Sequence, residues 1–240
     1  MGTTGGVATP ESELLRAKIG LWLPELSAAG RRFVDHPRVR ELYPEYLETM
    51  HWVVRASVPL METARTRASE IAGDPVATTV AAYFEKHIDE EVDHDEWLLQ
   101  DLEALGRDRA DVLLRPPSPT VAGVIGAQYY WILHFHPVAL LGYTMLLEGY
   151  APAPADVEDL MARTGYGPES FRTMSGHAEL DPGHADELAE TIDALPLRAE
   201  QSAVMGLSAM STVHGLARAF DEMVDGWDAS RVEDDLPTIV

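Results

Sequence analysis

Apolar residues recur every three to four positions along most of this chain, and this helical period limits its fold more than any other feature. No stretch alternates Val, Ile and Thr with polar residues, as a half-buried β-strand would. The period and the breaks at Pro and Gly predict seven helices, over residues 10–34, 38–72, 76–105, 119–150, 155–163, 169–194 and 197–227. Helices joined by short loops indicate an all-α bundle.

Pro and Gly mark the clearest helix boundaries. Pro10 and Pro119 each follow a Thr or Ser, so both are expected at the start of a helix. The segment 73–75, Gly-Asp-Pro, should end the second helix, and Pro59 should kink it. The pattern predicts one helical domain over residues 10–227, between a flexible N-terminus, residues 1–9, and an acidic C-terminal tail, residues 228–240.

Composition narrows the range of partners. The 240 residues include 40 acidic and 18 basic side chains, which gives a formal net charge of -22. Nucleic acid and anionic membrane surfaces are therefore not expected as partners, because both bind basic faces. The chain has no cysteine, which excludes disulfides, thiolate nucleophiles and iron–sulfur clusters. Any metal must be held by nitrogen and oxygen ligands.

The most apolar stretch, residues 121–150, is long enough to span a bilayer. Four polar residues interrupt it, however: Gln128, His134, His136 and Glu148. We interpret it as a buried central helix and not as a membrane span. The N-terminal residues lack the basic and apolar segments of a secretory signal. A soluble, cytoplasmic protein is therefore expected.

Charged and imidazole side chains occupy the apolar face of the third predicted helix. At about 100° per residue, His94 lies on the same face as Val80, and His87 lies on that face seven residues earlier. Glu90 and Glu91 flank His94. Unpaired charges on a buried face would cost several kcal/mol, and a bound cation would offset that cost.

The sixth predicted helix shows the same anomaly. His177, Asp181 and His184 are spaced i, i+4 and i+7, so all three project from one face. Two imidazoles and a carboxylate suit iron, manganese or zinc. In the central helix, Glu148 is a lone carboxylate in a nearly uncharged run.

Each of these features alone has a purely structural explanation. An inward His is usually a hydrogen-bonded core residue. Glu90 and Glu91 are consistent with a salt-bridged surface, and Glu148 is consistent with the end of a helix. Their occurrence on three separate helices favours a metal site. Glu91, Glu148 and Asp181 supply three negative charges, so two divalent ions would leave the site near neutrality once hydroxide, Glu90 or an anionic substrate joins them.

These residues resemble the ligands of the haem-oxygenase-like diiron oxidases, seven-helix enzymes that activate O2 without haem. That family places a Glu and a His on one helix, a lone Glu on a middle helix, and H-x3-D-x2-H on a later helix. His177, Asp181 and His184 match the last element without gaps. His94 matches the first His, and Glu148 matches the lone Glu. The resemblance covers about residues 40–227 and implies a single-domain haem-oxygenase-like bundle.

The resemblance also implies a ligand set, which in this sequence is Glu91, His94, Glu148, His177, Asp181 and His184. The first carboxylate is open, because Glu90 or His87 could fill the place of Glu91. We choose Glu91 because its three-residue offset places it one helical turn from His94. The implied cofactor is a labile pair of Fe(II)/Fe(III) ions, with O2 as co-substrate and an external electron donor.

The chemistry implied by the resemblance is oxidation of a C–H or N–H bond of a small molecule. Family substrates include amino acids and fatty acids, and outcomes include N-oxygenation, desaturation and C–C cleavage. We expect a small carboxylate-bearing metabolite, above all a free amino acid, in specialised natural-product biosynthesis. Four polar residues on apolar helices are candidates to line the substrate pocket: His51, Gln128, His134 and Arg218. A homodimer is expected from its frequency among oligomers.

Two alternatives stay open. One is a fatty-acid-oxidising member of the same family. The other is a ferritin-like iron-binding or storage protein without an organic substrate, because Glu91-x2-His94 and Asp181-x2-His184 loosely imitate its paired motif. His177 and the order of the helices argue against a store. Thiaminase-type relatives depend on a catalytic Cys, which this chain lacks.

Overall fold

The computed structural model describes the backbone of residues 9–234 and the side chains in that range except those of residues 181, 182 and 231–234. Most of the expected N-terminal segment and the last six residues of the expected tail lie outside the described residues. The described chain is helical and contains no strand. Its helices are α1 (Glu11–Gly20), α2 (Leu23–Val34), α3 (Val39–Val54), α4 (Ser57–Ser69), α5 (Pro75–Glu91), α6 (His94–Ala104), α7 (Arg109–Leu114), α8 (Pro119–His134), η1 (Pro137–Ala139), α9 (Leu140–Gly149), α10 (Pro154–Thr164), η2 (Pro168–Ser170), α11 (Arg172–Ala194) and α12 (Ala199–Asp234).

The all-α prediction is confirmed, but the expected number of seven helices is wrong. Four predicted helices are interrupted, at residues 21–22, 55–56, 92–93 and 135–136, and α7 was not predicted. Pro59 does not kink a continuous helix, because the chain has already broken before α4 and Pro59 lies in the first turn of α4, where its missing N–H is tolerated. α12 continues beyond the expected end at residue 227.

Polar side chains cap several of the predicted helix starts. Asp74 accepts hydrogen bonds from the amides of Val76 (2.8 Å) and Ala77 (3.3 Å) at the start of α5. Ser118 accepts one from the Val121 amide (3.2 Å) at the start of α8. The sequence signals for these two boundaries were therefore reliable.

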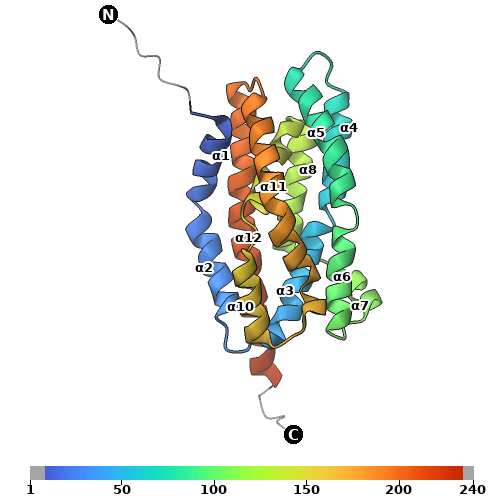
Figure 1. Cartoon of the computed structure of the whole chain (residues 1–240), viewed down its shortest axis with the longest axis vertical. Coiled ribbons are helices and arrows are strands. Elements are labelled where there is room, and N and C mark those ends of the chain that lie inside the picture. Colours follow the sequence, from blue (N-terminus) through green and yellow to red (C-terminus); the bar gives the residue numbers. More distant parts are fainter. Residues whose placement is uncertain (1–8, 235–240) are drawn as a thin grey trace, which may run out of the picture.

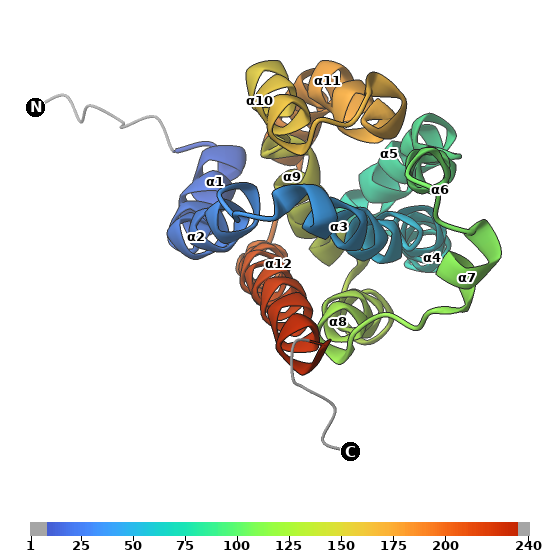
Figure 2. The ribbon, with the colours of Figure 1, turned by 90° about the horizontal axis from the view of Figure 1, so that it is seen from below.

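The helices run roughly along the long axis of the molecule (Figure 1). Seen along that axis, α3 and α9 lie between α1 and α2 on one side and α5 and α6 on the other (Figure 2). α9 is buried almost throughout, which agrees with the interpretation of this stretch as a central helix. Gly142 allows α9 to approach α12 closely, since a Cβ there would lie 2.1 Å from the Met205 carbonyl oxygen.

Within the described residues, the structure contains no helix with the length and apolar character required to cross a membrane.

Candidate metal centre

One group of three side chains, here called the first position, joins α5, α6 and α11. It consists of Glu91, His94 and His177, whose candidate ligand atoms all lie within 4.8 Å of one another. Glu91 is the last residue of α5 and His94 is the first residue of α6. His94 Nδ1 lies 3.0 Å from Glu91 Oε2, and the centroids of the His94 and His177 rings are 4.9 Å apart.

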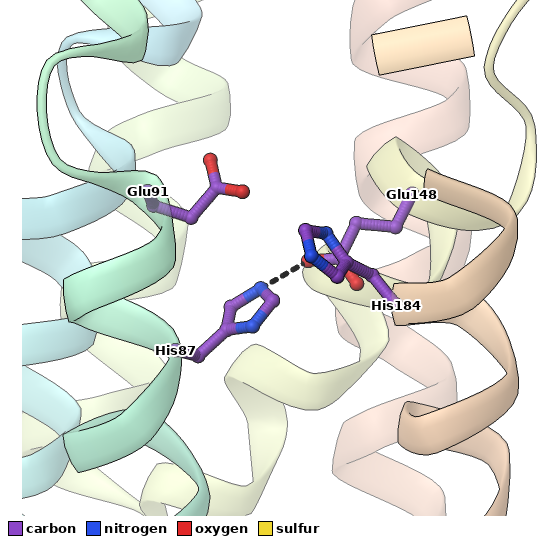
Figure 3. A group of neighbouring side chains, drawn as sticks. All are labelled: His87, Glu91, Glu148 and His184. Carbon is purple, nitrogen blue, oxygen red and sulfur yellow. Dashed lines mark hydrogen bonds and ion pairs between the residues drawn. The ribbon is translucent and has the colours of Figure 1, made fainter. Parts of the chain in front are cut away.

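A second group, here called the second position, joins α5, α9 and α11. His87, Glu91, Glu148 and His184 offer ligand atoms that also lie within 4.8 Å of one another (Figure 3). His87 Nε2 is 2.5 Å from Glu148 Oε1. The rings of His87 and His184 meet edge to face, with centroids 5.2 Å apart.

Glu91 belongs to both positions. A carboxylate has two oxygens, so one such side chain can bind two cations at once. The structure therefore brings together five of the six residues in the expected ligand set, and it adds His87, which the sequence had left as an alternative. The two candidate groups therefore adjoin each other at Glu91.

A break in the backbone sets the direction of His94. Asp93 adopts a left-handed conformation, with φ of 70°, and separates α5 from α6. The predicted continuous helix over residues 76–105 is therefore wrong at this point. Asp residues tolerate the left-handed region better than most side chains, which allows the break without a glycine.

Hydrogen bonds to the backbone orient the first position. His177 Nδ1 lies 2.9 Å from the carbonyl oxygen of Thr173, one turn earlier in α11, so Nδ1–H donates and Nε2 is left for a metal. Asp101, which is fully buried on α6, accepts hydrogen bonds from the amides of Arg172 (3.1 Å) and Thr173 (3.0 Å). Asp101 thus caps α11 and fixes it against the helix that carries His94.

Electrostatics differ between the two positions. Burial lowers the pKa of His87, but the hydrogen bond and charge of Glu148, together with Glu91 and Glu90, outweigh it and raise the pKa to about 9. Burial also raises the pKa of Glu148. Both shifts mean that this pair retains a proton at neutral pH. At the first position, burial lowers the pKa of His177, which keeps its imidazole neutral.

Burial likewise opposes ionisation of Glu91, but the hydrogen bond from His94 and the surrounding imidazoles outweigh it and lower the pKa of Glu91. This carboxylate is therefore ionised in the centre of the cluster.

Two buried polar atoms in the second position have no hydrogen-bond partner, namely Glu148 Oε2 and His184 Nδ1. An unpaired buried carboxylate oxygen is costly, and a cation bound there would remove the cost. Together with a donor set of only imidazole and carboxylate groups, this observation fits iron or another first-row divalent metal.

The sequence matches a family profile described as iron-containing redox enzymes over residues 43–213. The chain belongs to this family. Its fold resembles that of a domain of unknown function with a haem oxygenase-like fold from Shewanella denitrificans OS217, with a TM-score of 0.78 and 18% identity over 97% of this chain and 98% of that one. It also resembles a TenA homologue from Pseudomonas syringae pv. tomato DC3000, with a TM-score of 0.62 and 13% identity over 86% of this chain and 92% of that one.

These likenesses show the haem-oxygenase-like fold that the sequence resemblance implied. A comparison with curated proteins finds no match. The segment that matches the family, residues 43–213, includes every described residue of the two metal positions.

Two further candidate ligands from the sequence, Glu90 and Asp181, lie outside the two groups of described residues. Glu90 is 33% exposed at the edge of the second position, where it contacts His87 Nδ1 at 3.1 Å and lies 4.0 Å from His184 Nε2. Asp181 lies in α11 between His177 and His184, but its side chain is outside the described residues.

The four residues expected to contact substrate are not brought together. His134 is exposed beside Tyr130, and Arg218 pairs with Glu222 at 3.6 Å on α12. Gln128 is buried and binds Thr212 and Ser208. His51 is buried with no hydrogen-bond partner at either ring nitrogen. None of the four is among the described residues that line the cavity beside the metal positions.

That cavity has a volume of about 380 Å³, and three of the candidate ligands, Glu91, Glu148 and His177, form part of its wall. The sequence reasoning missed the cavity, because its walls are built from apolar side chains that look like ordinary core residues. Asp101 and Thr173 were also missed. The available signal for Asp101 was its position seven residues after His94 and three after Leu98, on the buried face of α6.

Proposed function

We propose that this chain is a non-haem diiron oxidase or oxygenase that uses O2 to oxidise a C–H or N–H bond of a small molecule. The observation that carries the proposal is the pair of metal positions that share Glu91 beside a cavity. Iron, when bound, supplies the electrons and the open coordination sites for O2 chemistry. An external electron donor would return the iron to its reduced form.

The side chains of the chain itself have separate tasks in this proposal. The imidazoles of His94, His177 and His184 hold the ions as neutral ligands. Glu91 would offer one oxygen to each ion, and His87 shares a proton with Glu148 that would have to leave before both could act as ligands. The apolar walls of the cavity keep water away from the reacting bond.

Of the two substrate classes expected from the sequence, the cavity supports the fatty-acid class better than the free amino acid. Its described lining contains no lysine or arginine that would bind a carboxylate away from the metals.

Anaerobic Fe(II) reconstitution followed by exposure to O2 tests the proposal. Wild type should bind two iron ions, whereas His177→Ala and His184→Ala should each bind one and lose O2 uptake. His36→Ala, which removes a histidine paired with Asp228, is the control and should behave as wild type.

Full iron content and O2 uptake in either ligand variant would contradict the assignment. Iron oxidation at the same rate with and without any organic substrate would instead support the ferritin-like alternative.

A further inference from the structure

The surface helix α8 carries no charged side chain, although the chain as a whole is strongly acidic. Residues 116–147 contain no Asp, Glu, Lys or Arg, and neither do residues 201–217 of the neighbouring α12. The formal net charge of the chain is -22. Two copies therefore repel each other where their acidic surfaces meet, and this repulsion is weakest across α8 and the adjoining part of α12.

α8 lies at the edge of the bundle, beside α12 (Figure 2). One of its faces is buried against the bundle, and there Gln128 is hydrogen-bonded to Thr212 and Ser208 of α12. The opposite face is exposed, with Tyr130 at 64% and Leu133 at 47%. Apolar side chains of this size, exposed together on an uncharged face, indicate a surface that binds another macromolecule.

The outer face of α8 is divided by side-chain size. Four residues share it at helical spacing, namely Gly123, Gly126, Tyr130 and Leu133. The two toward the start of the helix are small, and the two toward its end are large. A Cβ added at Gly123 or Gly126 would meet no other atom within 4 Å, so the small half is open to a partner.

A second copy of the chain fits this division. If two α8 helices crossed antiparallel about a two-fold axis near residues 126–127, Tyr130 of one copy would lie against the partner's Gly123. Leu133 would likewise lie against the partner's Thr120. Each large side chain would then fill the space beside a small one. Parallel helices would instead place large side chains against each other and leave a gap between the glycines.

We propose that the chain forms a homodimer through the outer face of α8, in which the two α8 helices cross antiparallel near Gly126. A glycine at the crossing lets the two backbones approach closely. This gives the homodimer expected from the sequence a specific interface. The inference does not rest on the metal centre, because none of the described candidate ligands lies on α8.

Light scattering after size-exclusion chromatography tests the dimer. Wild type should elute with twice the mass of one chain. Tyr130→Glu should raise the dissociation constant by more than about 100-fold, because each dimer would bury two new charges without a partner. Leu114→Glu is the matched control and should leave the dimer intact, since Leu114 is 81% exposed on a different helix, α7.

An exchange of large and small side chains tests the antiparallel register. Gly123→Tyr alone should weaken the dimer by more than about tenfold, because two tyrosines then compete for one space. Gly123→Tyr combined with Tyr130→Gly should restore most of the affinity, because each tyrosine would again lie against a glycine. Circular dichroism verifies that each variant is folded.

A single introduced cysteine locates the two-fold axis, because the chain has no Cys of its own. Gly126→Cys should be crosslinked to a second copy by a short bismaleimide. Ala155→Cys should not be crosslinked, since Ala155 is exposed on α10, which lies on the opposite side of the bundle from α8 (Figure 2).

A wild type that is monomeric at every concentration tested would overturn the inference. A dimer that persists in Tyr130→Glu, or that is crosslinked through Ala155→Cys and not through Gly126→Cys, would overturn the assigned interface. Failure of the exchange to restore affinity would overturn the antiparallel register. None of these measurements needs iron or O2, so failure of this inference is distinguishable from failure of the proposed function.

Discussion

The two metal positions share Glu91 but differ in how the protein prepares them. At the first position, His177 is fixed by the Thr173 carbonyl, α11 is capped by Asp101, and burial lowers the pKa of His177, so this imidazole carries no proton at the nitrogen that faces the cluster. At the second position, His87 is bound to Glu148 through a retained proton. The first position is thus ready for a cation, whereas the second must release a proton first. We therefore expect the two positions, which share one carboxylate, to differ in metal affinity.

Removal of Glu91 should give the largest effect, because it takes a ligand from both positions. Glu91→Ala should lower the affinity for both metals by more than about 100-fold, as measured by anaerobic Fe(II) titration with metal analysis. Glu85→Ala is the matched control, since this carboxylate lies on the same helix but pairs with Arg65 outside the metal centre. If Glu91→Ala bound two metals with the affinity of wild type, Glu91 would not be a ligand shared by the two positions.

A change of pH should separate the two positions. The raised pKa of His87 means that its proton stays bound up to about pH 9, so metal affinity at the second position should increase with pH by up to about tenfold per unit below that value. The first position should respond less near neutrality, because the pKa of His177 is lowered. Zinc titrations at several pH values measure both affinities.

His87→Gln tests the assigned cause of this pH dependence. It should move the response at the second position to lower pH, because the proton that a metal must displace then lies on the Glu148 carboxyl and no longer on an imidazole with a pKa of about 9. The same response over the same pH range in this variant, or equal responses at the two positions of wild type, would contradict the difference drawn between them.

A smaller effect is expected from the residue that fixes α11. Asp101→Asn replaces one acceptor of the Arg172 and Thr173 amides by a donor, so His177 should be held less precisely and metal affinity at the first position should fall about tenfold. The second position should change much less. Asp108→Asn is the control, because Asp108 also caps a helix, α7, through a single oxygen that accepts bonds of 2.8 and 3.2 Å, outside the metal centre. Equal losses at both positions would indicate general destabilisation.

The sequence predicted the helical class and the candidate ligands better than it predicted helix continuity. Strong signals such as Asp74 before Pro75 act locally, and the structure follows them. The break at Asp93 has no Pro or Gly, and it depends on how α5 and α6 pack against other helices. The periodicity of apolar residues in the sequence therefore gave no sign of the break at Asp93.

The candidate site divides in the same way. His177 and His184 could be assigned to one face of one helix from their spacing alone, because that relation is local. Whether His87, Glu90 or Glu91 faces them depends on where the tertiary fold places the end of α5 relative to α9 and α11, which the spacing does not encode. The cavity could not be predicted for a related reason: the apolar residues that line it are of the same types as those that pack in the core.

The left-handed turn at Asp93 has a mechanical consequence. Glu91 and His94 belong to different helices, so no continuous ladder of backbone hydrogen bonds fixes the angle between these two ligands. An ion bound to both would itself join the two helix ends, and the stiffness of this joint would then vary with metal content. Binding of a metal would in this way also fix the angle between α5 and α6.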